Sequence, residues 1–142
     1  MGHSTVRFKV NGVERESAAD PGTPLIHILR NDFGLKGTRF GCGTEQCNAC
    51  LVLVEGRAVT ACTMPLAAAD GKAITTVEGL GDEARPHPLQ RALLDEQAAQ
   101  CGYCLSGILV KAAELLERDP GVDEAGVRAV LRAAAEMRAR QP

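Results

Sequence analysis

The chain has 142 residues, of which 45% are hydrophobic, so it can build one compact core or two very small ones. Sixteen Lys and Arg residues against eighteen Asp and Glu residues give a net charge of −2, which leaves no basic field for nucleic acid. Aromatic residues make up only 3%, which argues against a module that stacks bases. Charged residues interrupt every apolar run and the N-terminus shows no signal peptide, so we expect no membrane span and a cytoplasmic protein.

The first half of the chain combines strand-like segments with turn signals. Asn11-Gly12 predicts a β-hairpin, because both positions of a two-residue hairpin turn need positive φ. Thr23 followed by Pro24 predicts a helix start, with Thr23 as the N-cap and proline at the first helical position. In chain order we expect strands at 5–10 and 13–17, a helix from Pro24, a long loop at 34–50, strands at 51–54 and 57–61, and a strand at 74–77.

After residue 78 the composition becomes rich in alanine, leucine, glutamate and arginine. Residues 79–88 collect glycine, proline and charge, which is typical of a linker. Helical periodicity then predicts helices at 89–97, 105–118 and 124–138. The expected fold class is α+β: a small mixed sheet packed on one helix in residues 1–78, followed by a helical domain in residues 79–142.

The cysteines carry the chemistry. Without a signal peptide, six cysteines indicate metal or redox chemistry rather than disulfides. Four have the spacing Cys42-x4-Cys47-x2-Cys50-x11-Cys62, and C-x4-C-x2-C is typical of plant-type ferredoxins that hold a [2Fe-2S] cluster. Gly41 and Gly43 would let bare backbone approach the cluster sulfides and donate N–H groups to them. The alternatives are inert buried cysteines and a structural zinc site, whose paired short knuckles fit the x4 gap poorly.

A second, shorter motif is Cys101-Gly-Tyr-Cys104. By itself it is compatible with a thiol–disulfide pair of the thioredoxin kind, with half of a zinc site, or with two core cysteines. A thioredoxin motif follows a strand and opens a helix, whereas here a predicted helix precedes the pair. Thiolates near the positive end of a helix would favour an anionic ligand.

Taken together, these motifs resemble the iron–sulfur small subunit of the molybdenum hydroxylases, the xanthine oxidase family. The resemblance rests on Gly41-Cys-Gly-Thr-Glu-Gln-Cys-Asn-Ala-Cys50, on Cys62 and on Gln100-Cys-Gly-Tyr-Cys104. Three further segments are most similar to the nicotinate dehydrogenase and isoquinoline oxidoreductase branch: Thr75-Thr-Val-Glu-Gly-Leu-Gly81, Pro86-His-Pro-Leu-Gln90 and Glu96-Gln-Ala-Ala-Gln100. The resemblance covers most of the chain, from about Thr5 to Arg118.

The resemblance implies a β-grasp ferredoxin-like domain followed by a four-helix domain. It implies that Cys42, Cys47, Cys50 and Cys62 hold the [2Fe-2S] cluster farther from molybdenum. Cys101 and Cys104 would be two ligands of a second cluster, and Gln100 would contact the pterin cofactor. The implied partners are a flavin or cytochrome acceptor and a molybdopterin-binding large subunit.

Some positions depart from the family pattern. Asn48 stands where glycine is usual and Glu45 where glycine is frequent, and both are tolerable in a loop. The family completes its second cluster with a later Cys-x-Cys pair, but no cysteine follows Cys104 in the printed chain. Without gaps, Glu136 and Arg138 fall at those positions; we favour the alternative, a deletion of the cysteine segment. A second cluster is therefore doubtful.

We expect an electron-transfer subunit of a molybdenum-dependent hydroxylase, with no substrate site of its own. No general base, nucleophile or phosphate-binding loop is apparent in the sequence. One alternative is a free-standing ferredoxin-like or regulatory iron–sulfur protein whose helical half binds partners. Another is a non-functional relic with an internal deletion.

Overall fold

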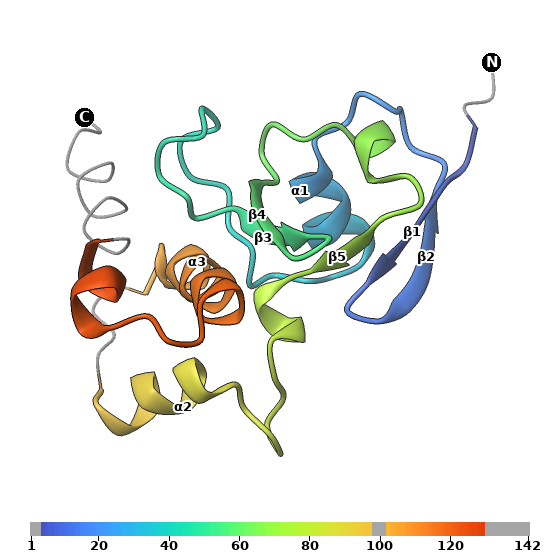
Figure 1. Cartoon of the computed structure of the whole chain (residues 1–142). Helices are drawn as coiled ribbons and strands as arrows, with labels where there is room; N and C mark the ends of the chain where they lie inside the picture. Colours follow the sequence, from blue (N-terminus) through green and yellow to red (C-terminus); the bar gives the residue numbers. More distant parts are fainter. Residues whose placement is uncertain (1–3, 98–101, 130–142) are drawn as a thin grey trace.

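A computed structural model of the chain describes residues 4–97 and 102–129 (Figure 1). Its centre is a five-stranded sheet in the order β2-β1-β5-β3-β4. Strands β1 and β5 run parallel, and the other neighbours run antiparallel. The strands are β1 (Val6–Val10), β2 (Val13–Ser17), β3 (Leu51–Val54), β4 (Arg57–Thr60) and β5 (Ala73–Thr75). This order of hairpin, helix, hairpin and closing strand confirms the predicted ferredoxin-like mixed sheet.

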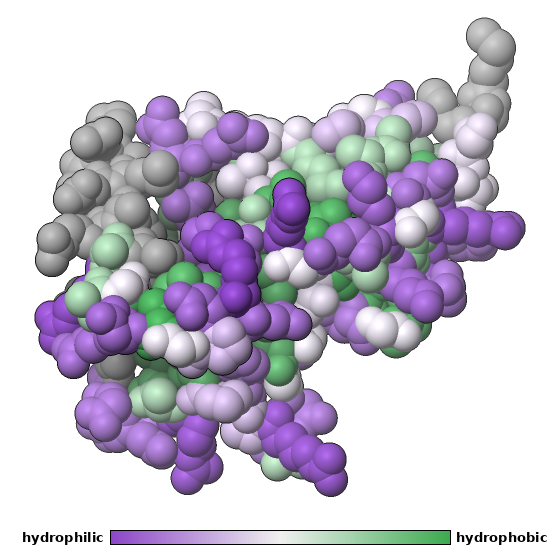
Figure 2. Space-filling model, viewed as in Figure 1, coloured by the Kyte–Doolittle hydropathy of each residue, from purple (hydrophilic) through white to green (hydrophobic). Residues whose placement is uncertain are grey.

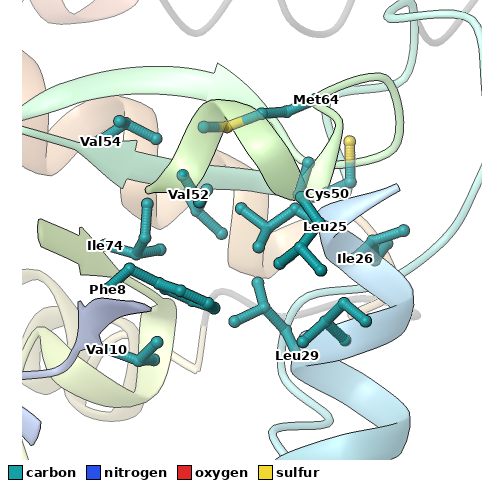
Figure 3. Packing of buried hydrophobic residues seen from close by; sticks show 14 of the residues in the cluster. Phe8, Val10, Leu25, Ile26, Leu29, Cys50, Val52, Val54, Met64 and Ile74 are labelled. Carbon is teal, nitrogen blue, oxygen red and sulfur yellow. The ribbon is translucent and has the colours of Figure 1, made fainter. Parts of the chain in front are cut away.

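One face of the sheet carries the main hydrophobic core. The short helix α1 (Leu25–His27) continues directly into a π-helical turn, η1 (Ile28–Asp32), and both lie across this face (Figure 1). Leu25 and Leu29 point at the strand residues Phe8, Val52 and Ile74, and all five are buried (Figure 3). This packing fixes the end of the helix from which the long loop departs.

The predicted cap of the first helix is wrong. Pro24, not Thr23, occupies the N-cap position, and no side chain caps the helix there. The reason is a distant partner: Pro24 forms an extended bridge with Pro65, and Leu25 N–H donates to the Met64 carbonyl at 2.8 Å. The carbonyl group of Met64 therefore satisfies the N–H group that a threonine cap would have served.

Strand β3 is buried on both faces, as its unbroken Leu-Val-Leu-Val sequence indicates. Val52 and Val54 join the main core, whereas Leu51 and Leu53 pack with Val110 on the opposite face. Val110 belongs to helix α3 (Leu105–Arg118), which matches its predicted bounds. The second half of the chain is thus packed directly on the sheet.

The remaining elements connect the sheet to α3. Helix α2 (Pro88–Asp95) is slightly shorter than predicted and is capped by a reciprocal pair between His87 and Gln90. Two 3-10 turns, η2 (Leu66–Ala69) and η3 (Val77–Gly79), flank β5. Of the third predicted helix, residues 124–129 are helical and the rest lies outside the described residues.

Hydrophilic side chains cover most of the face in Figure 2, and hydrophobic residues show over the sheet and beside α3. Within the described part of the chain, no helix has the length and apolar character needed to cross a membrane.

Candidate metal centre

Three of the cysteines lie on the long loop between η1 and β3. The Arg30 guanidinium holds the start of this loop by donating to the backbone oxygens of Lys36 at 2.7 Å and Thr38 at 2.8 Å. Arg39 N–H donates to the Ala49 carbonyl at 3.1 Å and joins the two sides of the loop. The loop is therefore fixed by the chain's own hydrogen bonds.

The four cysteines of the first motif lie in two pairs. Cys42 N–H donates to the Cys47 sulfur at 3.4 Å, and Cys47 N–H donates to the Cys42 sulfur at 3.3 Å. The second pair forms where Cys50 enters β3 and Cys62 follows β4, and Ala61 N–H donates to the Cys50 carbonyl at 3.2 Å. The structure thus arranges the four residues predicted from the spacing as two pairs, Cys42 with Cys47 and Cys50 with Cys62.

Cys42 lies in an environment that favours its thiolate form. The Cys42 sulfur accepts backbone N–H groups from Gln46 at 3.2 Å and from Thr44 and Cys47 at 3.3 Å each. Burial by itself would raise the pKa of Cys42, but the hydrogen bonds from Thr44, Cys47 and Gln46 outweigh it and lower the pKa to about 6. Cys42 is therefore largely a thiolate, the form that binds metal, at neutral pH.

Cys50 has the opposite character. Burial, together with the neighbouring Cys62 and Cys47 thiols, raises the pKa of Cys50 to about 12. Cys50 is only 2% exposed and lies at the edge of the main core (Figure 3). A metal that binds here must displace a proton from Cys50, so binding is coupled to proton release.

Left-handed backbone shapes the turn between Cys42 and Cys50. Gly43, Glu45 and Asn48 have φ values of 71°, 64° and 60°. Gly41 is required for a different reason, because a Cβ at this position would lie 2.4 Å from the Cys47 sulfur. Glu45 and Asn48 thus adopt the left-handed conformation, which is more favourable for glycine than for a residue with a side chain.

The donor set consists of four cysteines in two pairs. In residues 4–97 and 102–129, no three His, Cys, Asp or Glu side chains are grouped so that they could hold a single ion. A structural zinc site would need four ligands around one ion. Two pairs of cysteines instead match two sulfide-bridged irons with two thiolates for each, so the residues present fit a [2Fe-2S] cluster.

The second cysteine motif is described only in part. Cys104 is half-buried and occupies the N-cap position of α3. Gln100 and Cys101 lie outside the described residues. Their predicted roles as pterin contact and cluster ligand stay predictions.

The start of α3 packs against the loop of the first motif. Ser106 Oγ donates to the Ala49 carbonyl at 3.3 Å, and a Cβ on Gly107 would lie only 1.7 Å from the Asn48 carbonyl oxygen. Helix and loop therefore touch backbone to backbone, between Cys47 and Cys50 on one side and just after Cys104 on the other.

Tyr103 adds a second connection between the two motifs. Its hydroxyl donates to the Phe40 carbonyl, two residues before Cys42. The Arg39 guanidinium lies 5.3 Å from the centre of the Tyr103 ring, within the range of a cation–π contact. Phe40 in turn stacks on His27, with ring centres 5.7 Å apart.

Three residues of the second half that contact the sheet or the cysteine loop were not predicted from the sequence: Tyr103, Gly107 and Glu114. Glu114 is 7% exposed and accepts hydrogen bonds from Ala58 N–H and, at 2.8 Å, from the Lys111 ammonium group. A signal existed, since Glu114 follows Val110 by four residues and so shares the buried face of the helix. For Gly107 and Tyr103 no local pattern could show which loop they touch.

Comparison with known proteins supports the same assignment for both halves. Residues 8–76 match the family model "2Fe-2S iron-sulfur cluster binding domain", and residues 76–137 match "[2Fe-2S] binding domain". One of the nicotinate dehydrogenase subunits of Pseudomonas putida is 50% identical over 125 residues, which are 88% of this chain and 80% of that protein. The alpha chain of isoquinoline 1-oxidoreductase from Brevundimonas diminuta is 41% identical over 123 residues, 86% of this chain and 80% of its own length.

A solved structure agrees over nearly the whole length. Quinoline 2-oxidoreductase from Pseudomonas putida 86 contains a chain that superposes with a TM-score of 0.85 and 27% identity, over 98% of both chains. The fold, the cysteine pairs and these matches define an iron–sulfur protein of the [2Fe-2S] class. The chain belongs to the iron–sulfur small subunits of the molybdenum hydroxylase (xanthine oxidase) family, which are electron-transfer subunits of oxidoreductases. In this family the molybdopterin is carried by the large subunit.

Proposed function

We propose that this chain carries electrons to a flavin or cytochrome acceptor from the molybdopterin centre of a large subunit, in the cytoplasm. The large subunit would hydroxylate an N-heteroaromatic compound or an aldehyde. The names of the similar proteins, nicotinate dehydrogenase and isoquinoline 1-oxidoreductase, favour an N-heteroaromatic substrate. This chain would bind no substrate itself.

The observation that carries the proposal is the paired arrangement of the first motif. Cys42 and Cys47 would hold one iron, and Cys50 and Cys62 the other. When bound, such a cluster accepts and returns single electrons with little rearrangement of its ligands. The chain's own residues fix the cysteines on a loop that is anchored to the core and direct N–H groups at the Cys42 sulfur, which stabilises negative charge there.

We further propose that residues 1–78 and 79–142 form two domains that are packed together as one structural unit. Support comes from α3, which packs on β3 through Val110 and on the cysteine loop through Gly107. This contact would place Cys104, which we assign with Cys101 to the molybdenum side, close to the first motif. Gln100 would face the pterin.

Co-purification tests the proposal. The full chain, tagged and expressed in its native host, is expected to bring down a molybdenum-containing large subunit in constant stoichiometry. Anaerobic addition of the heteroaromatic substrate to the complex should then bleach the visible absorbance of the chain's iron–sulfur centre. A monomer that retains its full iron content and binds no molybdenum subunit would instead support the free-standing ferredoxin alternative.

A further inference from the structure

Glu45 makes side-chain hydrogen bonds to a segment that lies 15–18 residues further along the chain. It lies between Cys42 and Cys47, on the exposed turn. Its φ of 64° lies in the left-handed region, which is unfavourable for a residue with a side chain. A glycine would avoid this cost, so the contacts of the side chain decide what Glu45 adds.

The Glu45 side chain reaches across to the other cysteine pair. One carboxylate oxygen accepts hydrogen bonds from the hydroxyl of Thr63 at 2.5 Å and from that of Thr60 at 3.2 Å. Thr60 and Thr63 stand on either side of Cys62 in the chain, and their hydroxyl oxygens are 2.9 Å apart. Glu45 therefore ties the turn that carries Cys42 and Cys47 to the turn that carries Cys62.

Because Glu45 and Thr63 are exposed, these hydrogen bonds add little to the global free energy of unfolding. Their effect is local: they oppose separation of the two turns, and with it the loss of metal. The carboxylate also holds a negative charge beside the centre. Reduction of the centre adds one electron, so a nearby negative charge makes reduction less favourable.

We propose that Glu45 is a positioning residue with two effects. Its hydrogen bonds hold the turn of Cys42 and Cys47 against the turn of Cys62, and its negative charge makes the reduction potential of the iron–sulfur centre lower than it would be without that charge. The proposal rests on the cluster that we assign to Cys42, Cys47, Cys50 and Cys62. It separates two effects of one side chain, the hydrogen bonds and the charge, and each can be removed alone.

The test uses the full chain as purified with its cluster, and two measurements on each variant. The first is the reduction potential by spectroelectrochemical titration; the second is the rate at which an iron chelator removes the metal. Glu45→Gln keeps an oxygen that accepts from both threonines but removes the charge. The double variant Thr60→Val, Thr63→Val keeps the charge but removes both donors. Glu14→Gln, on β2 at the opposite edge of the sheet from β4, is the matched control for loss of charge.

We expect Glu45→Gln to have a more positive potential and an iron-release rate within about twofold of the parent chain. The Thr60→Val, Thr63→Val variant should release iron several-fold faster, with a much smaller change in potential. Glu45→Gly should show both effects, and Glu14→Gln neither. An unchanged potential in Glu45→Gln, or unchanged release in the threonine variant, overturns the proposal. A parent chain that binds no iron overturns the cluster assignment as well, so the two failures are distinguishable.

Discussion

The two cysteine motifs of this chain are built in different ways. The first gathers four cysteines on a loop and a hairpin end that are anchored to the main core, and its own backbone supplies N–H donors to the Cys42 sulfur. The second contributes Cys104 at the start of α3, with Cys101 three residues earlier, and α3 is held by contacts to β3, β4 and the first motif's loop. The first motif supplies its own four cysteines and N–H donors, whereas the second is positioned by its contacts to the sheet and to the first motif's loop.

This difference predicts which substitutions affect only their own motif and which also affect the other motif. A change in the first motif should remove its metal and also weaken the surface on which α3 rests. A change at the start of α3 should leave the first motif's four cysteines in place. Five predictions test that asymmetry, beginning with the largest effect.

The largest effect is expected from Cys47→Ser. Loss of one thiolate from the Cys42–Cys47 pair should abolish or severely weaken the cluster and reduce the stability of the β-grasp half, because metal binding and loop structure are coupled. Iron analysis and visible absorbance measure the loss. The matched control is Cys104→Ser, which should keep the cluster of the first motif. A Cys47→Ser chain with the full absorbance of a [2Fe-2S] centre would show that Cys47 is not a ligand.

The second prediction concerns the number of irons. Between Cys104 and residue 142 the sequence contains neither cysteine nor histidine, and carboxylates are poor partners for iron–sulfide. We therefore expect about two irons for each 142-residue chain and a single paramagnetic signal on reduction. Cys101 and Cys104 should react with a thiol reagent in the native protein. Four irons, two signals and protected cysteines would show that ligands for a second cluster come from elsewhere.

The sequence predicted the elements that are determined by nearby residues. The Asn11-Gly12 hairpin, the Leu-Val-Leu-Val strand and helix 105–118 lie where they were expected, since turn chemistry and hydrophobic period act locally. The cysteine spacing also predicted four ligands, which the structure places in two pairs, and their role as cluster ligands stays a prediction. The Thr23 cap failed because Pro24 pairs with Pro65, a contact 41 residues away in the chain, which no local pattern encodes.

The contacts between the two motifs were not predictable for the same reason. From the sequence alone, Gly107 only lowers the helix propensity of residues 105–118. The structure shows that the Asn48 carbonyl lies where a side chain at position 107 would be. Likewise, the side chain of Tyr103 could only be assigned a partner once Phe40 was placed. The boundary between residues 78 and 79 stays a prediction, and the contacts of α3 with the sheet show how closely the two parts are joined.

The third prediction breaks the contact between α3 and the loop. Gly107→Ala places a methyl group where the Asn48 carbonyl oxygen lies, so helix and loop must move apart. We expect the free energy of unfolding to fall by about 1–3 kcal/mol, despite the better helix propensity of alanine. Gly121→Ala is the control, because its added Cβ would meet only Asp119 at an ordinary 3.8 Å. Equal stability of the two variants would contradict the close packing.

The fourth prediction concerns Glu114, which joins α3 to β4. Burial alone would raise the pKa of this carboxyl, but the hydrogen bond from Ala58 N–H and the Lys111 ammonium group hold it below its usual range. A lowered pKa means that the carboxylate stabilises the fold above the unfolded value of 4.5 and loses that effect only as pH falls through the folded value.

Glu114→Ala leaves the Ala58 N–H without its partner and should lose about 1–3 kcal/mol of unfolding free energy at pH 7. The difference from the parent should stay constant between pH 7 and pH 5, because the carboxylate remains ionised over that interval. Denaturant unfolding at both pH values measures it. Glu117→Ala, on the exposed side of the same helix, should change stability by less than about 0.5 kcal/mol. A difference that shrinks already at pH 5 would contradict the lowered pKa.

The smallest effect is expected at Tyr103. Tyr103→Phe removes one hydroxyl that donates to the Phe40 carbonyl and keeps the ring beneath Arg39. Because the side chain is 45% exposed, water can replace the lost partner, and the cost should stay near the low end of about 0.5–1.5 kcal/mol. The expected signature is therefore faster amide hydrogen exchange in residues 36–50, with little change in global stability. Tyr103→Leu also removes the ring and should accelerate exchange further. If neither variant changes exchange in this loop, Tyr103 does not couple the second motif to the first, and that coupling then rests on Ser106 and Gly107 alone.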